Sequence, residues 1–565
     1  MGKLGPLVIF ILAILGAAWI FTRDAASGAA PTDPSGASQV PDPGAIPVLM
    51  LYGSEKQAWI EAVTTEFNAR KVQVAGQPVQ VIAKAMGSGE LMDEVLAGRQ
   101  QATLVSPASS AFIALANAKS RTATGKDLVP QAENVVLSPV VIAMWQPMAE
   151  ALGWPGTKIG WADVLKIAQD PRGWATKGQA QWGRFRFGHT HPEYSNSGLQ
   201  TLLAEVYAGS GKVAGLTLAD VTKPDVGTFV QGIERSVVHY GSSTGFFAKR
   251  MFAAGPSTLS AAVLYENLVI EANAAERKPS FPVVAIYPKE GTFWSDHPTG
   301  LVDRPWVTAQ QKEAAKAYVK FLLDRPQQER AMTFGFRPAA VEVALGAPID
   351  QAHGVDPKEP TTTLEVPAAE VIDGAISLWR QRKKPAHVVL AIDTSGSMED
   401  DRKIVHAREG AKDFVGLLGE GDRLSILTFN SSVSWVTEGE KLDANRPRAS
   451  QIVGSLIAGG STSLYDAVDS AVKRLEQDKD AGQITAVVVL SDGADTTSKT
   501  KLADLLGRLD PGPEGGSGIR VFTIGYGKDA KGDVLKKIAE ITQGKFYAGT
   551  TNDIRAVFRD IATFF

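Results

Sequence analysis

From residue 46 onward, short apolar runs alternate with longer segments whose apolar residues recur every three to four positions. Short runs of this kind predict strands, and the longer periodic segments predict amphipathic helices. Strands that alternate with helices are typical of a parallel sheet with right-handed crossovers. The sequence therefore predicts an α/β fold. The first strand–helix pairs are expected at residues 46–53 and 54–70, 79–89 and 90–98, and 102–107 and 108–119.

A second series of strands and helices occupies the C-terminal third of the chain. Strands are expected at residues 386–393, 423–430, 484–493 and 520–527, with helices such as 403–419 and 464–477 between them. A Pro/Gly/Thr-rich stretch and one helical segment separate this series from the first. These shifts predict a first domain at residues 46–345, a linker with a bridging helix at 346–384, and a last domain at 385–565.

The N-terminal segment reads as a membrane anchor. Residues 4–22 carry no charge, and a helix of that length spans about 28 Å, close to the thickness of a hydrocarbon core. We therefore expect residues 1–23 to form a transmembrane helix and residues 24–45, rich in Pro, Gly and Ser, to form a linker. The bulk of the chain would then lie outside the cytoplasm, as a single-pass protein. A cleaved signal peptide is the alternative.

Composition excludes several classes of function. The 58 basic and 61 acidic residues give a net charge of −3 with no long block of one sign, which does not indicate a nucleic-acid binder. The chain has no cysteine, so disulfides and thiolate metal sites are excluded.

Oxygen-bearing side chains follow three of the expected elements in the last domain. One strand ends on Asp393 and is followed by Ser395 and Ser397, a Gly-rich loop before a helix carries Thr462, and another strand is followed by Asp492. Open α/β sheets bind ligands at the carboxyl ends of their strands. Carboxylates and hydroxyls without His or Cys suit Mg²⁺, with Mn²⁺ or Ca²⁺ as alternatives. The competing interpretation is turn and helix-cap chemistry.

These residues resemble a known metal site. "DTSGS", the threonine of "GGST" and the aspartate of "LSDG" are similar to the metal-ion-dependent adhesion site of von Willebrand factor A domains. The resemblance covers residues 385–565 and implies a doubly wound, Rossmann-like fold that binds a partner protein's carboxylate through the metal. We expect no enzyme, because no nucleophile with a positioned base accompanies these residues.

The first domain resembles the type II periplasmic solute-binding fold, in particular the molybdate- and sulfate-type binding proteins. The resemblance lies in the order of elements, with residues 134–153 as the crossover between two lobes and residues 281–293 as the return strand. Helix N-termini with hydroxyls can hold an oxyanion, although such residues also serve as ordinary caps. The candidate ligand-binding residues are Ser54, Ser88, Ser106, Ser195, Asn196 and Ser197.

Other residues of the first domain argue against a simple oxyanion site. Glu55 and Glu90 would repel an anion if they faced the cleft. His189 and His191 are spaced two apart, which is a weak pattern for a metal site. We therefore expect a membrane-anchored, extracytoplasmic binding protein that mediates metal-dependent protein–protein adhesion or scaffolding. The alternative is an oxyanion receptor for a transporter that docks through its last domain.

Overall fold

The computed structural model describes residues 42–275, 278–478, 480, 482–510, 519–527, 530, 532–542, 544–551 and 553–565. Residues 46–565 form one compact unit. The expected anchor at residues 1–23, like most of the expected linker at residues 24–45, lies outside the described residues. Among the residues that are described, no helix combines the length and apolar character that a membrane span needs. The transmembrane helix stays a prediction.

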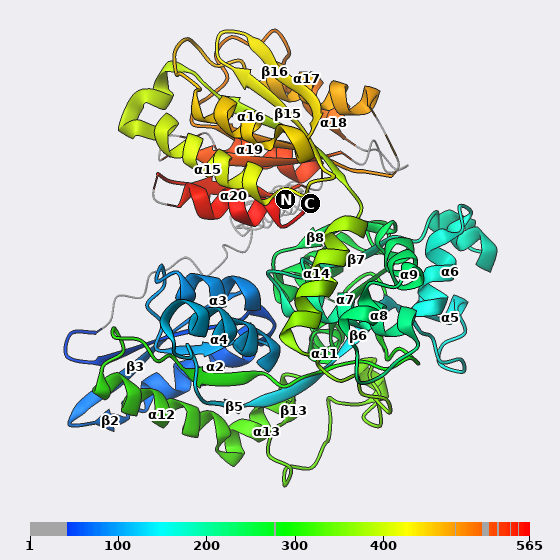
Figure 1. Cartoon of the computed structure of the whole chain (residues 1–565), viewed down its shortest axis with the longest axis vertical. Helices are drawn as coiled ribbons and strands as arrows, with labels where there is room; N and C mark the ends of the chain where they lie inside the picture. Colours follow the sequence, from blue (N-terminus) through cyan, green and yellow to red (C-terminus); the bar gives the residue numbers. More distant parts are fainter. Residues whose placement is uncertain are drawn as a thin grey trace, which may run out of the picture. The chain divides into compact units, whose positions relative to one another are not determined.

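The first lobe contains a six-stranded mixed sheet with helices around it (Figure 1). Its strands are β1 (Ile46–Gly53), β2 (Gln73–Val74), β3 (Gln77–Met86), β4 (Leu104–Ser106), β5 (Ala132–Asn134) and β12 (Pro298–Leu301), and its helices are α2 (Gln57–Ala69), α3 (Ser88–Leu96), α4 (Ser110–Thr124), α12 (Ala309–Leu323) and α13 (Arg325–Thr333). The strand order is β2-β3-β1-β4-β12-β5. β1 runs parallel to β3 and β4, as the alternating pattern predicts, whereas β12 returns from much later in the chain and pairs antiparallel with β4.

The second lobe contains a seven-stranded mixed sheet. Its strands are β6 (Val136–Trp145), β7 (Phe187–Thr190), β8 (Val237–Gly241), β9 (Ala261–Tyr265), β10 (Val283–Ile286), β11 (Trp294–Ser295) and β13 (Arg337–Pro338), and its helices are α5 (Gln146–Ala151), α6 (Trp161–Gln169), α7 (Asn196–Ser210), α8 (Leu218–Val221), α9 (Pro224–Glu234), α10 (Thr244–Ala254) and α11 (Glu266–Ala274). The main path is β10-β6-β9-β7-β8, and both β11 and β13 pair with β6. The segment that the sequence predicts as the crossover, residues 134–153, therefore forms β6 and then the short helix α5. This helix has Pro147 in its first turn.

The bridging helix packs against the second lobe. It is α14 (Ala369–Arg382), and it contacts α7, α8 and α9. Trp379 is its buried anchor, because its ring lies 4.7 Å from the ring of His191 and 5.2 Å from that of Tyr240, measured between centroids.

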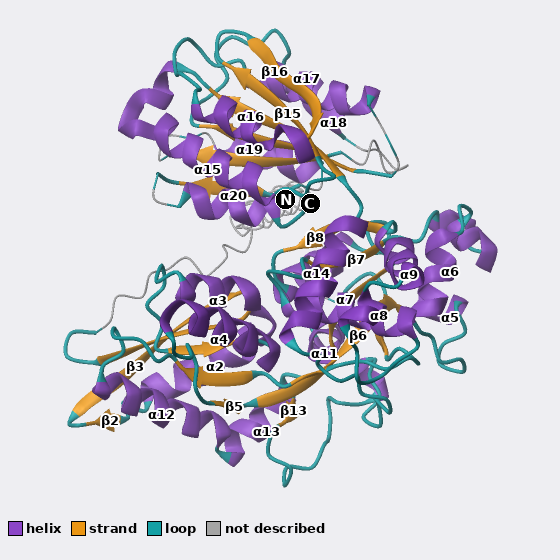
Figure 2. Cartoon of the chain, viewed as in Figure 1, coloured by secondary structure: helices purple, strands orange, loops and turns teal. Residues whose placement is uncertain are grey.

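The last domain is a doubly wound α/β sheet (Figure 2). Its strands are β14 (Ala386–Asp393), β15 (Arg423–Phe429), β16 (Val433–Lys441), β17 (Ile484–Ser491), β18 (Arg520–Tyr526) and β19 (Phe546–Gly549), and its helices are α15 (Lys403–Leu417), α16 (Leu442–Gly454), α17 (Leu464–Gln477), α18 (Leu502–Leu509), α19 (Gly532–Ile541) and α20 (Ile554–Ala562). The order is β16-β15-β14-β17-β18-β19, with only β16 antiparallel to its neighbour among these strands.

The central strand β14 is buried on both faces, which explains its continuous apolar sequence. Val388 and Leu390 face one core cluster with residues of α15, whereas Val389 and Ala391 face another with residues of α17. Burial on both faces fixes the position of β14 and hence of the carboxylate at its end. The structure confirms the α/β class, with two mixed-sheet lobes followed by a doubly wound domain.

Candidate functional site

The carboxyl ends of two neighbouring strands bring Asp393 and Asp492 to one edge of the last sheet. β14 ends at Asp393, and β17 ends one residue before Asp492. The two strands pair in parallel, with Ile392 opposite Leu490. Both aspartates are almost fully buried. The edge is the one that the sequence predicts for a ligand.

Hydrogen bonds join four of the five predicted metal residues into a continuous chain. The backbone N–H of Ser395 donates to Asp393 Oδ1 at 2.8 Å, and Ser397 Oγ donates to Asp492 Oδ1 at 2.8 Å. The two hydroxyls, Ser395 Oγ and Ser397 Oγ, are 3.2 Å apart. Ser491 Oγ completes the arrangement by donating to Asp393 Oδ2 at 2.6 Å. Ser491 has no place in the predicted set, although it directly precedes Asp492.

The fifth residue, Thr462, borders the same space. The backbone N–H of Thr462 donates to Thr496 Oγ1 at 2.9 Å, and the backbone N–H of Thr496 donates to the Thr462 carbonyl at 2.8 Å. These two bonds connect the Thr462 loop to the loop after β17. An atom at the β position of Gly493 would lie 3.8 Å from Thr462 Oγ1 and 3.9 Å from Ser397 Oγ. The two hydroxyls therefore flank one small space beside Asp492.

The electrostatics of this cluster favour a cation. Burial raises the pKa of Asp393, and the charge of Asp492 adds to the rise, while hydrogen bonds from Ser395 and Ser491 oppose it. Two buried carboxylates close together need compensating positive charge, of which the Lys403 ammonium beside Asp492 supplies one. All five predicted side chains offer oxygen, which is the donor type that Mg²⁺ prefers. The residues present therefore fit a magnesium ion.

Lys403 is a part of this cluster that the sequence did not indicate. Its Nζ lies 2.7 Å from Asp492 Oδ2 and 3.4 Å from the carbonyl oxygen of Ser397. The lysine begins α15 directly after Asp401 and Arg402, whose φ values of 51° and 57° are left-handed and turn the chain sharply. This turn directs Lys403 back toward the strand ends, and no residue pattern reveals it.

In the first domain, the predicted cleft residues are buried where the two lobes meet. Ser54 Oγ, in the first lobe, donates to Ser243 Oγ of the second lobe at 2.9 Å and accepts from the Gly245 N–H at 3.0 Å. Ser195 and Ser197 both bond to Thr244, at 3.1 and 2.8 Å between hydroxyl oxygens. Asn196, between these two serines in the sequence, donates from Nδ2 to Tyr265 Oη at 3.0 Å and to Ser295 Oγ at 3.1 Å. Four of the six candidates thus form one polar interlobe cluster: Ser54, Ser195, Asn196 and Ser197.

The other two candidates bond within the first lobe. Ser88 Oγ accepts from the Ala108 N–H, and Ser106 Oγ accepts from Thr299 Oγ1, each at 2.9 Å. Both bonds join segments that are distant in sequence, so neither serine acts as the helix cap that the alternative interpretation expects.

The two glutamates of the first domain differ in their surroundings. Burial alone would raise the pKa of Glu55, but Lys56 and His297 outweigh that effect and lower it to about 2. Lys56 is fully buried, with its Nζ 2.8 Å from Glu55 Oε1. The pair is therefore neutral overall and repels no anion. Burial raises the pKa of Glu90 to about 7, with a further contribution from Asp560.

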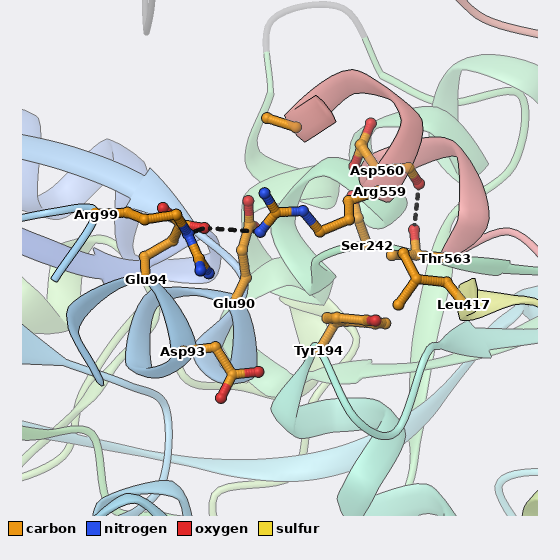
Figure 3. Close-up of a pocket in the computed structure, with 11 residues that line it drawn as sticks. Glu90, Asp93, Glu94, Arg99, Tyr194, Ser242, Leu417, Arg559, Asp560 and Thr563 are labelled. Carbon is orange, nitrogen blue, oxygen red and sulfur yellow. Dashed lines mark hydrogen bonds and ion pairs between the residues drawn. The ribbon is translucent and has the colours of Figure 1, made fainter. Parts of the chain in front are cut away.

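Glu90 lines a cavity of about 200 Å³ between α3, the loops at Tyr194 and Ser242, and α20 (Figure 3). Figure 3 shows Arg559 reaching from α20 toward Glu94, and their charged atoms are 3.1 Å apart. The lining residues are Glu90, Asp93, Glu94, Arg99, Tyr194, Ser242, Leu417, Ala556, Arg559, Asp560 and Thr563.

Comparison with known families agrees with both parts of the fold. Residues 48–337, just over half of the chain, match the family described as bacterial extracellular solute-binding protein. The chain belongs to this family. Residues 387–559 match the von Willebrand factor type A domain. The chain therefore carries a von Willebrand factor A domain after a domain of the solute-binding family.

Individual proteins similar to this chain are distant from it. Inter-alpha-trypsin inhibitor heavy chain H4 of Sus scrofa is 28% identical over 160 residues, which cover 27% of this chain and only 17% of that relative's length. A periplasmic thiamin binding protein is 15% identical and covers 60% of this chain and 98% of its own, with a TM-score of 0.44. The sulfate-binding protein SubI from Mycobacterium tuberculosis H37Rv is 20% identical, covers 52% and 88%, and has a TM-score of 0.36. A von Willebrand factor type A protein from Catenulispora acidiphila is 23% identical, covers 32% and 42%, and has a TM-score of 0.29.

Proposed function

We propose that this protein is an extracytoplasmic binding protein that attaches to a partner protein through a divalent cation held by its von Willebrand factor A domain. The cation is Mg²⁺, with Mn²⁺ or Ca²⁺ as alternatives, and its ligands are Asp393, Ser395, Ser397, Thr462 and Asp492. The observation that carries the proposal is the hydrogen-bonded chain from Asp393 through the two serine hydroxyls to Asp492.

The bound ion would supply an open coordination position of positive charge that a carboxylate of the partner can fill. Asp393 and Asp492 supply the negative charge, and the hydroxyls supply neutral ligands. The role is binding rather than catalysis, because the side chains that the structure brings to this cluster include no histidine base beside a hydroxyl.

We further propose that residues 1–23 hold the protein at the cell membrane, with the two domains outside. Support comes from the uncharged run of residues 4–22 and from membership of an extracellular family. Extraction tests this part of the proposal: the full-length protein should stay with membranes after a carbonate wash, and a deletion of residues 1–23 should release it.

Metal titration of the full-length protein tests the central proposal. We expect Mg²⁺ and Mn²⁺ to bind in calorimetry, and Asp393→Asn to weaken binding by more than about tenfold, because a ligand charge is lost. Asp504→Asn is the matched control, since Asp504 is exposed in the first turn of α18 of the same domain. Equal binding by Asp393→Asn and the wild type would contradict the proposal.

A second candidate function is capture of a small oxyanion for a transporter. It is favoured by the family and by Gln200 Nε2, an N–H donor that is buried without a hydrogen-bond partner among the described residues. Gln200 lies beside the polar interlobe cluster, because Ser295 Oγ contacts both Asn196 Nδ2 and Gln200 Oε1. Titration with sulfate and molybdate should then show saturable binding that Ser197→Ala weakens. No heat and no change in melting temperature with either anion would remove this candidate.

A further inference from the structure

A buried cluster in the second lobe, distant in sequence from the predicted metal residues, consists of His189, Glu205 and Glu234. His189 lies on β7, Glu205 on α7, and Glu234 ends α9 (Figure 1). All three are fully buried. One ligand atom from each, a histidine nitrogen and two carboxylate oxygens, lies within 4.8 Å of the others. Two carboxylates enclosed in this way are costly unless a positive charge compensates them.

The hydrogen bonds of His189 fix which ring nitrogen is available. Its Nδ1 lies 2.8 Å from the carbonyl oxygen of Thr190. A carbonyl only accepts, so Nδ1 carries the proton, and the Nε2 of a neutral ring presents a lone pair. That Nε2 lies 3.1 Å from Glu234 Oε1. A neutral ring therefore turns an acceptor toward a carboxylate, which is also an acceptor.

Neither carboxylate resolves this conflict. Glu234 Oε2 already accepts from the hydroxyl of Tyr240 at 2.6 Å, a bond that orients the carboxylate. Both oxygens of Glu205 are buried without a hydrogen-bond partner among the described residues. Three groups that can accept a hydrogen bond thus face one another. No described side chain places a hydrogen-bond donor between them.

We propose that His189 Nε2, Glu205 and Glu234 together bind a divalent transition metal, for which Zn²⁺ is the best match. One imidazole and two carboxylates are ligands that zinc takes, and the two negative charges balance the ion inside a buried site. Zinc–ligand distances of about 2.0–2.2 Å place the ligands of a tetrahedron about 3.4 Å apart. His189 Nε2 and Glu234 Oε1, 3.1 Å apart, are already within that separation, and the Glu205 oxygen, within 4.8 Å of both, would move closer when the ion binds.

The surrounding bonds have the form that supports a metal ligand set. A metal-bound histidine commonly donates its other N–H to a backbone carbonyl, as His189 does to Thr190, and ligating carboxylates are themselves hydrogen-bonded, as Glu234 is by Tyr240. Tyr240 is a positioning residue here. The site connects β7, α7 and α9, and its neighbour Tyr240 packs on Trp379 of α14. The role of the metal site is to fix the part of the second lobe against which the bridging helix α14 lies.

Zinc analysis of the full-length protein tests this site separately from the proposed magnesium site at Asp393 and Asp492. The background is Asp393→Asn with Asp492→Asn, which removes the other metal site and leaves the second lobe unchanged. The protein is stripped with a chelator in denaturant and refolded with Zn²⁺, because fully buried ligands take up metal as the chain folds. We expect one zinc per chain by elemental analysis, and one imidazole with oxygen ligands by X-ray absorption at the zinc edge.

Variants then locate the ion. Glu205→Gln and His189→Gln should lose the zinc and the rise in melting temperature that it causes, and Tyr240→Phe should bind it about 10- to 100-fold more weakly. Asp225→Asn, exposed in the first turn of α9, is the matched control and should keep the metal. The absorption spectrum of the background protein decides the matter even if a ligand variant fails to fold.

Two results would overturn the proposal. The first is a refolded background protein that holds no zinc, in which case a charged His189 and a shared proton satisfy the glutamates. The second is zinc that persists in both ligand variants or shows no imidazole in its absorption spectrum, which would place the ion elsewhere.

Discussion

At the scale of single residues, Lys403 sets the charge of the cluster that contains Asp393 and Asp492. Its ammonium contacts Asp492 Oδ2, while the other oxygen of Asp492 accepts from Ser397. The lysine therefore orients the carboxylate and also offsets part of the negative charge that attracts a cation. A von Willebrand factor A site with such a lysine should bind its metal more weakly than the carboxylates alone would allow.

Replacing Lys403 tests this role. Lys403→Met keeps most of the buried stem and removes the charge, so we expect Mg²⁺ to bind about tenfold more tightly, from a loss of roughly 1–2 kcal/mol of repulsion. Calorimetry on the full-length protein measures the change. Lys412→Met, on the exposed side of the same helix, should have no effect. Unchanged or weaker binding in Lys403→Met would show that orientation of Asp492 outweighs charge.

At the scale of elements, α14 shows how a segment that looks like a linker becomes part of a core. Trp379 is 1% exposed and contacts the rings of both His191 and Tyr240. Trp379→Ala should therefore lower the free energy of unfolding by about 3–5 kcal/mol. Urea denaturation measures this, with the exposed Ser377→Ala as control. A cost below about 1 kcal/mol would mean that α14 is only loosely attached.

The elements also show what the sequence could and could not predict. Asp393 ends one buried strand and Asp492 follows another that pairs with it in parallel, so alternation alone places both at one edge. Lys403 reaches them through a left-handed turn that leaves no pattern in the residues. Ser54 looks like a local helix cap, yet its partner Ser243 is 189 positions away. Such contacts depend on how lobes and helices pack, which periodicity does not encode.

At the scale of the whole unit, residues 46–565, the last domain contacts both lobes through the region of α20. Arg559 pairs with Glu94 of the first lobe, and Phe564 stacks on His239 of the second lobe, with ring centroids 6.2 Å apart. The backbone N–H of Tyr240 also donates to the Phe564 carbonyl at 3.4 Å. A rearrangement of the lobes would therefore change the contacts that the region of α20 makes with them.

Glu90 lines the cavity beside α20, and its titration makes the stability of the folded state depend on pH. Its pKa rises from 4.5 to about 7, so the folded state favours the protonated form, and stability is lost as pH rises through that interval. Glu90→Gln mimics the neutral form and can still accept the bond from the Gly87 N–H. We expect the variant to melt at a higher temperature than the wild type at pH 8 and at the same temperature at pH 5. An equal difference at both values would contradict the assignment, and Glu313→Gln, exposed on α12, is the control.

The polar interlobe cluster is bordered by two glycines whose missing side chains set how near the lobes come. A β-carbon on Gly89 would collide with the backbone carbonyl of Glu193, and one on Gly245 would collide with that of Ser54. Backbone meets backbone at both points, and backbone cannot rotate away as a side chain can. Closure of this domain thus ends against a hard mechanical stop, and a single methyl group added at either position would act as a wedge that holds the two halves ajar.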